Sequence, residues 1–302
     1  MSVRPLTIDH HAESGPVRQA RNRTRSARVV GSALAVFRRQ PIATAVVLVF
    51  LVVGALAPVL APDDPAAIHM RERLQGPSGA HWLGTDEYGR DLLSRVLYGA
   101  RIAFQAGIIA VGIAMIGGVL IGLVAGYFGG SVDYLLSRVV EGLQAFPVVL
   151  LAIAITAVWG PSVRHAMVSI GIATIPDFAR ITRGVVLPTK EQPYVEAARV
   201  VGCGNARILR IAILPNCLPA ITVLLSFSIA NSILYESALS FLGLGAQPPQ
   251  PSWGTMLSTA KSYMFDHPSY TLVVGLALSL TIIALNLFGD AVREVVDPLV
   301  KT

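Results

Sequence analysis

The residue types that support catalysis occur in this sequence, but not in catalytic spacings. Nucleotide hydrolysis needs a phosphate-binding loop of the form G-x-x-x-x-G-K-[ST], and this pattern is absent from the 302 residues. Ser94 and Ser240 have no histidine and acid partners in a known motif, which gives an intramembrane hydrolase no support. We therefore expect neither an enzyme nor a metal site. The histidines, which lack any metal-ligand spacing, are His10, His11, His69, His81, His165 and His267.

The most informative spacing of turn and helix residues lies between two apolar runs late in the chain. Pro193 suits the first turn of a helix, and residues 194–201 favour its continuation. Gly202 supplies the backbone freedom for a sharp turn. Residues 206–214 predict a second helix, which we expect Pro215 to end. Such a helix–turn–helix unit has the shape to enter a groove in another protein. The alternative is a basic amphipathic loop that lies on lipid.

A second polar cluster lies between residues 81 and 95. Thr85 or Asp86 can cap a helix with an apolar face of leucine and valine side chains. We expect this helix to lie along the outer membrane surface. Four charged residues have near-helical spacings that allow them to pair with one another: Asp86, Arg90, Asp91 and Arg95.

Glu236 is the one acid that the pattern predicts to be buried within a long apolar run. A lone acid in a membrane segment is a candidate for contact with a transported substrate. The alternative is a hydrogen bond to a neighbouring helix or loop, which the nearby Asn231 and Ser237 permit.

The composition indicates a membrane protein whose helices position these residues. The chain is 53% hydrophobic and 14% charged, with a mean hydropathy of +0.62, which is too apolar for an ordinary soluble domain. A single segment can cross lipid only as a helix, so the predicted fold is all-α. Cys203 and Cys217 have no disulfide or metal spacing and are expected to be small packing residues.

Six apolar runs predict six transmembrane helices. The second carries Gly118, Gly122 and Gly126 at four-residue spacing, which predicts one flat stripe for close helix contact. The fourth is interrupted by Pro176, Asp177, Arg180 and Arg183, so we expect its polar end to emerge early into the cytoplasm or to face protein. The six runs are 42–60, 102–127, 143–159, 167–187, 218–239 and 270–288.

The distribution of basic residues predicts the orientation. Residues 1–39 contain eight arginines and little apolar content, which is typical of a disordered basic tail. With this tail inside, residues 180–210 and their basic side chains also lie inside, and both termini are cytoplasmic. The alternative, that the first apolar run is a signal peptide, fails because the run is too long and no cleavage site follows it.

The unit around Gly202 resembles the loop of ABC importer permeases, whose pattern is EAA, three residues, Gly, nine residues, then I-x-L-P. Only Ala212 departs from it. The resemblance implies a coupling helix that docks into an ATPase subunit. The residues to which it assigns this role are Tyr194, Glu196, Ala197, Ala198, Gly202, Arg207, Leu214 and Pro215.

The cluster after His81 is similar to the G-T-D-x-x-G-R-D stretch of the C-type subunit of peptide, nickel and glutathione importers. Further segments of this type are 126–130, 236–245 and 251–254. The functional interpretation of this region is an outer platform that receives a substrate-binding protein. Its motif residues are Gly84, Thr85, Asp86, Gly89, Arg90 and Asp91.

These resemblances imply the type I ABC importer permease fold, with six transmembrane helices, in a bacterial plasma membrane. The chain would form the translocation pathway for di- or oligopeptides with a second homologous permease, one or two ATP-binding subunits and an extracytoplasmic binding protein. ATP and Mg would be bound by the partners, with no cofactor on this chain and no nucleic acid. Nickel and glutathione remain alternative substrates. A self-contained secondary transporter is disfavoured, because neither an inverted repeat nor a row of ionisable groups at mid-depth is visible.

The predicted organisation has five parts. They are a cytoplasmic tail at 1–39, a first transmembrane helix at 40–61, an extracytoplasmic segment with the interfacial helix at 62–101, a permease core at 102–292 with the coupling loop at 190–215, and a cytoplasmic C-terminus at 293–302.

Overall fold

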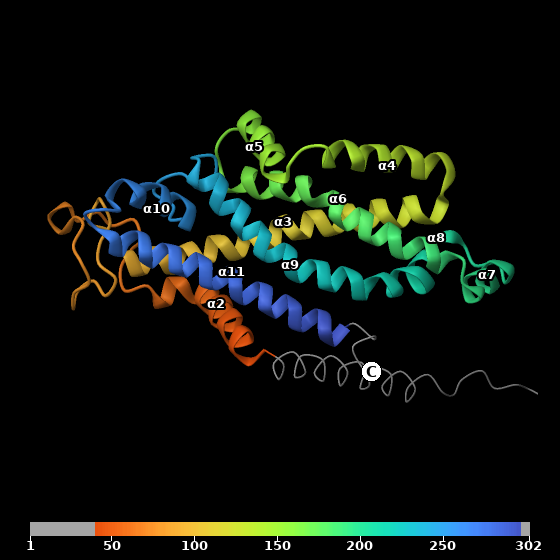
Figure 1. The fold of residues 1–302 in the computed structure, drawn as a ribbon, viewed down its shortest axis with the longest axis horizontal. Coiled ribbons are helices and arrows are strands. Elements are labelled where there is room, and N and C mark those ends of the chain that lie inside the picture. The colour runs from red at the N-terminus through yellow and green to blue at the C-terminus, as the bar shows by residue number, and fades with distance from the viewer. Residues whose placement is uncertain (1–39, 297–302) are drawn as a thin grey trace, which may run out of the picture.

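The computed structural model describes residues 40–296, which form an elongated bundle of α-helices (Figure 1). The predicted basic tail and the last six residues lie outside the described part. The helices are α2 Pro41–Leu60, α3 Leu92–Phe128, α4 Gly130–Gln144, α5 Val148–Trp159, α6 Val163–Lys190, α7 Pro193–Val200, α8 Asn205–Ile208, α9 Leu214–Phe241, α10 Trp253–Ala260 and α11 Pro268–Val296, with short helical turns η1 Met70–Glu72, η2 Leu209–Ile213 and η3 Lys261–Tyr263.

Four helical segments among the described residues are long and apolar enough to cross a membrane. They are α2, α3, α11 and the continuous segment Asn205–Phe241 that ends in α9. The pair α4 and α5 adds a fifth if its two bent halves form one span. The all-α prediction is confirmed. Of the six predicted spans, length and composition identify four, or five with the bent pair, among the described residues.

The predicted third span, 143–159, is wrong as a single helix. Helix α4 ends at Gln144, α5 begins at Val148, and the two axes are bent by 88°. The break falls at Pro147, because a proline disfavours helical backbone in the residue before it. With 12 residues α5 is about 18 Å long, well short of a hydrocarbon core of about 30 Å.

The predicted interfacial helix is also absent from the structure. Residues 62–91 are largely irregular, and the apolar residues assigned to that helix form the first turns of α3. The N-cap residue of α3 is Asp91, whose carboxylate accepts a hydrogen bond from the Ser94 amide; it is neither Thr85 nor Asp86. No proline interrupts the next 37 residues, so the helix that begins at this cap continues to Phe128.

The long helices α3 and α6 form the centre of the bundle and lie side by side along most of their length (Figure 1). The predicted glycine stripe of α3 is confirmed as the contact. A Cβ atom on Gly118 would meet the backbone and Phe178, one on Gly122 would meet the backbone and Thr182, and one on Gly126 would meet Val186. Small residues therefore let the two backbones approach closely.

Helix α6 continues further than the predicted fourth span. It runs to Lys190, and the alternative that its polar end faces protein holds for Arg183, which pairs with Asp133 of α4. Pro176 and Pro188 lie inside α6 without breaking it. Its length of 28 residues is sufficient for a span, and only its polar residues exclude it from the set of apolar helices.

Candidate functional site

Two segments of the chain lie at opposite ends of the bundle (Figure 1). One is the protruding unit of residues 191–213, here called the knob, which contains α7 and α8. The other is the irregular segment 62–91, here called the cap, which lies beside α10. The knob holds most of the predicted coupling residues, and the cap holds the whole predicted GTD-type motif.

Gly202 makes the sharp turn of the knob, as predicted. Its φ of +82° lies in the left-handed region, which side chains with a Cβ rarely adopt. The Gly202 amide donates to the Arg199 carbonyl and the Cys203 amide donates to the Ala198 carbonyl. These two bonds form a Schellman motif, the usual way for a glycine to end a helix.

The inner side of the knob is anchored to the ends of α3 and α6. Val195, Ile208 and Ile213 are buried in one apolar cluster with Tyr127 of α3. The Tyr127 hydroxyl also donates to Asn205 Oδ1 at 3.0 Å, and the Arg199 guanidinium lies 5.4 Å from the centre of the Tyr127 ring. The knob is therefore packed directly against the central helices.

Pro215 does not end the second helix of the knob, contrary to the prediction. Helix α8 passes through the π-helical turn η2 into α9, and Pro215 lies in the first turn of α9. The Leu214 amide donates to the Leu209 carbonyl, five residues earlier, in the wider π pattern. Pro215 has no amide hydrogen, but the first turn of a helix needs none. The knob is thus continuous with a membrane helix.

The outer side of the knob is an exposed surface of mixed apolar and charged residues. Val200 and Val201 are 83% and 82% exposed, and Tyr194 is 47% exposed. Glu196 lies in the first turn of α7, where a negative charge is favoured by the helix dipole. Exposed valines on a rigidly anchored element are typical of a protein-docking surface. The other exposed coupling residues are Ala197, Arg207 and Pro215, whereas Ala198 and Leu214 are half-buried.

Asp86 is the centre of the cap. Its carboxylate is fully buried and accepts from the amides of Tyr88 and Arg90, each at 2.9 Å. Arg90 Nε donates to it at 2.6 Å, and Arg95 Nε lies 3.2 Å away without a hydrogen bond. The predicted pairing is confirmed for Asp86 with Arg90 and Arg95.

Asp91 joins the cap to the start of α3. Its Oδ2 accepts from the amide and the hydroxyl of Ser94, both at 2.8 Å, while its Oδ1 lies 2.9 Å from Nδ1 of His81. Nε2 of His81 lies 3.3 Å from a carboxylate oxygen of Glu72. The hydrogen bond to Asp91 raises the pKa of His81, with a further contribution from Glu72, against the opposing effect of burial.

The cap is also fixed to a more distant helix. The Tyr270 hydroxyl of α11 donates to Glu87 at 3.3 Å, and next to the cap the Trp253 indole of α10 donates to the Val96 carbonyl of α3 at 3.0 Å. Burial, followed by the nearby charge of Asp86, raises the pKa of Glu87. Gly89 has a φ of +73°, and a Cβ there would overlap the His69 carbonyl, so no other residue fits. Gly84, with a φ of +85°, ends a separate turn in which its amide donates to the His81 carbonyl, and Thr85 pairs with Asp91 in an isolated β-bridge.

Glu236 lies in α9 beside the N-terminus of α10. It is buried, and its Oε1 accepts from Ser240 at 2.6 Å and from Ser252 at 3.0 Å. Ser252 caps α10, and the Ser240 hydroxyl accepts the Ala246 amide at 2.9 Å. The contacts of Glu236 therefore match the hydrogen-bonding alternative, since they hold the α9–α10 connection.

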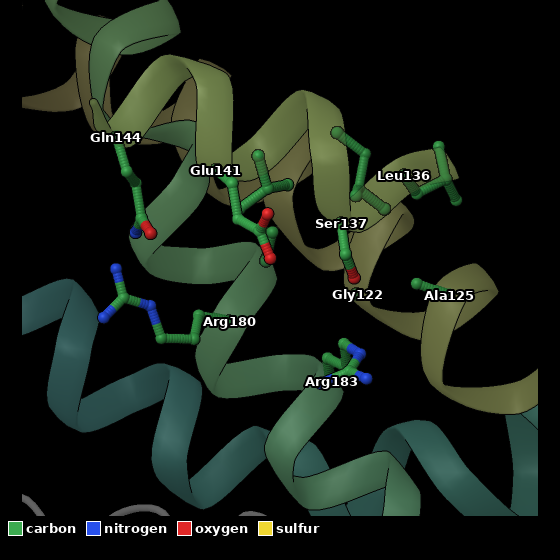
Figure 2. Close-up of a pocket in the computed structure, with 11 residues that line it drawn as sticks. Gly122, Ala125, Leu136, Ser137, Glu141, Gln144, Arg180 and Arg183 are labelled. Carbon is green, nitrogen blue, oxygen red and sulfur yellow. The ribbon is translucent and has the colours of Figure 1, made fainter. Parts of the chain in front are cut away.

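A pocket of about 210 Å³ with a mixed apolar and polar lining lies between α3, α4 and α6 (Figure 2). Arg183 binds Asp133 in a bidentate pair, at 2.6 and 2.7 Å, which fixes α4 against α6. Arg180 and Gln144 extend toward each other across the pocket. The sequence predicted Arg180 as an interruption of an apolar run and as part of the basic cytoplasmic region, and it gave no local signal of the contact between Asp133 and Arg183, which lie 50 positions apart.

Comparison with known proteins identifies relatives over most of the chain. Residues 118–302 match the family model for binding-protein-dependent transport system inner membrane components. The chain is 42% identical over 253 residues to a dipeptide transport system permease protein of Alkalihalophilus pseudofirmus, with 84% of this chain and 83% of the relative covered. It is 43% identical over 270 residues to a glutathione transport system permease protein of Pectobacterium atrosepticum, with 88% and 90% covered.

Two further comparisons support the same grouping. A probable D,D-dipeptide transport system permease protein of Escherichia coli is 39% identical over 253 residues, with 84% of this chain and 85% of the relative covered. A chain of a methionine ABC transporter solved in inward-facing conformations superposes with a TM-score of 0.50 at 18% identity, covering 68% of this chain and 96% of that chain. The latter is a likeness of fold.

The first prediction concerns the buried carboxylate of the cap. Asp86→Asn removes the charge that compensates Arg90 and Arg95, and breaking a buried pair in this way costs about 3–5 kcal/mol. We expect a large fall in the thermal unfolding midpoint of the purified protein in detergent. Asp64→Asn, in the exposed part of the same segment, is the control and should change stability by less than about 1 kcal/mol. Equal midpoints for the two variants would contradict the assignment.

The second prediction concerns the pH dependence of the cap. Because the pKa of His81 is raised in the folded state, its stabilising effect is complete below the unfolded value of about 6.5 and is lost as the pH rises through the folded value. The unfolding midpoint of the wild type should therefore fall between about pH 6 and about pH 8. His81→Gln should reduce this pH dependence. A slope that is the same in both proteins would show that the protonated His81 does not stabilise the cap.

Proposed function

Because this chain belongs to the family of binding-protein-dependent transport system inner membrane components, we propose that its two ends serve two different partners. The chain is the transmembrane permease component of an ABC transporter and a multi-pass inner membrane protein, and it is not the ATPase. A component of this kind works with ATPase and binding-protein partners. The open questions are which surface serves each partner, and for which substrate.

The knob is proposed to be the coupling element that docks into an ATPase subunit. The observation that carries this assignment is its two-sided construction. Val195, Ile208 and Ile213 anchor it to the central helices, whereas Val200 and Val201 are exposed on the opposite side. Closure of two ATPase subunits would move the knob, and the continuous α8–α9 helix would carry that movement into the membrane. ATP and Mg²⁺ would be bound by these partners.

The orientation that fits this proposal has the knob in the cytoplasm and the cap outside. Arg199, Arg207 and Arg210 lie on the knob or its connection to α9, and basic residues are retained on the cytoplasmic side. Both termini are then cytoplasmic. Helix α6 completes six spans with the bent pair α4–α5, because its length suffices and its contacts with α3, α5 and α9 remove much of its surface from lipid.

The cap is proposed as the platform for an extracytoplasmic binding protein. Its buried ion pairs and its link to α11 support a rigid surface on that side of the bundle. Asp91 belongs to this segment and is also the N-cap residue of α3, so a movement caused by a loaded binding protein would reach α3 through Asp91.

Short peptides are the proposed substrate, moved through a pathway formed with a second, homologous permease chain. The relatives described above are named for dipeptide, D,D-dipeptide and glutathione transport, and this range supports a small peptide over nickel. Glutathione transport is the second candidate, because the relative named for it covers as much of the chain.

A substitution on the knob should separate coupling from folding. Glu196→Lys reverses an exposed charge, and Gly202→Val places a branched side chain in a left-handed turn at a local cost of about 1–2 kcal/mol. We expect each variant to lower ATP-dependent dipeptide uptake at least tenfold while its amount in the membrane is unchanged by immunoblot. Glu191→Lys changes an exposed acid at the first position of the knob, ahead of α7 and outside the assigned coupling residues, and should transport normally. Normal uptake by both knob variants would refute the coupling role.

The set of partners can be tested directly. The tagged chain, extracted from its native membrane in mild detergent, should co-purify with a second permease and with one or two ATP-binding subunits identified by mass spectrometry. Glu196→Lys should weaken recovery of the ATP-binding subunits but not of the second permease. Recovery of the chain alone from a membrane that supports uptake would contradict the proposed assembly.

A further inference from the structure

One face of α6 is polar and exposed at the middle of its length. Asp177 is the fifteenth of the 28 residues of α6, so it lies about 21 Å from either end. Arg180 and Gly184 follow at helical spacing on the same side, and all three are exposed. The opposite side, with Phe178 and Val186, is buried against the glycine stripe of α3.

The packing of α6 on α3 therefore leaves an acid and a base exposed on the other side of α6. Lipid is a poor environment for them, because an ionised side chain at mid-depth of a membrane is costly and almost always faces water or another protein group. Asp177 and Arg180 interact electrostatically, but within the described residues the Arg180 guanidinium forms no salt bridge. Both groups are thus free to bind something else.

The pocket beside Arg180 offers a second unused donor. Gln144 Nε2 of α4 is buried without a hydrogen-bond partner, and it points toward Arg180 (Figure 2). Arg183, by contrast, is already held by Asp133. A guanidinium and an amide N–H converge on one space of about 210 Å³ and can together bind a carboxylate, while Glu141, the one acid among the residues that line this pocket, is paired with Arg138.

Helix α9 lies on the other side of this exposed polar face of α6. Tyr235 lies near enough to Asp177 for the two side chains to interact electrostatically. Asn231 is exposed one helical turn from Tyr235. Helices α4, α6 and α9 thus contribute an amide, an acid, a base and a phenol to this region.

We propose that Asp177, Arg180 and Gln144 line the translocation pathway and contact the charged termini of a passing peptide. Arg180 and Gln144 bind the terminal carboxylate, and Asp177 binds the terminal ammonium group. This inference rests on the proposed function and adds the substrate-contacting residues to it. The opposite charges of Asp177 and Arg180 suit a ligand that carries one charge of each sign and no net charge.

The test uses the complete transporter in liposomes with its binding protein and radiolabelled alanyl-alanine, which has both free termini. We expect Asp177→Asn and Arg180→Gln each to lower ATP-driven uptake at least tenfold. Arg164→Gln is the matched control, because Arg164 is an exposed arginine in the first turn of the same helix. It should stay within twofold of the wild type. Assembly and stimulation of ATP hydrolysis by the loaded binding protein should be retained in all three variants.

A second measurement does not depend on transport. In a Cys203→Ala background, Asp177→Cys in the assembled complex should react with a charged, membrane-impermeant thiol reagent, and alanyl-alanine should slow this reaction. Val49→Cys, on the exposed side of α2, should not react. Protection by the dipeptide would place the substrate next to Asp177.

Three results would overturn the inference. Uptake by Asp177→Asn and Arg180→Gln equal to that of Arg164→Gln would show that these charges do not serve the substrate. Loss of assembly in both variants would place them at a subunit contact, and an unreactive Asp177→Cys would place that position away from the pathway. Absence of alanyl-alanine uptake by the wild type would instead count against the proposed substrate. The reaction of Asp177→Cys with the thiol reagent would still report whether this face of α6 is open to water.

Discussion

The close contact between α3 and α6 is the constraint on which the rest of this structure depends. Gly118, Gly122 and Gly126 have no side chains, so the backbone of α6 lies directly against α3. Two long helices held in this way form a rigid axis with the cap at one end and the knob at the other (Figure 1). The same contact decides which side of α6 is buried, and therefore which polar residues are left exposed.

The two ends of this axis use different physical means to remain ordered. The cap has few apolar residues to bury, and it relies on compensated charges around Asp86 and on the hydrogen bonds of Asp91. The knob buries three aliphatic side chains and uses a glycine to turn the chain. A charge network is sensitive to the loss of any one partner, whereas an apolar anchor leaves the outer side of the knob free for docking.

Much of this molecule could be predicted from its sequence. The apolar composition indicates membrane helices, the spacing around Gly202 predicts the turn, and the four-residue repeat of glycines predicts a close contact. The motifs at 84–91 and 196–215 are sufficient to indicate the family. Each of these signals is local, because composition, turn chemistry and helical periodicity act over a few residues.

The tertiary structure alone decided the remaining features. In the structure, the residues of the predicted interfacial helix form the start of α3, and the predicted third span is bent at Pro147. The chain remains helical through Pro215 and continues as α9. The tertiary structure also brought Asp133 to Arg183 and Gln144 to the pocket beside Arg180. Residues that meet across dozens of positions leave no periodic trace in the chain. Which of these residues meet depends on which faces of the helices pack together. That packing results from all the contacts in the bundle and not from any single sequence pattern.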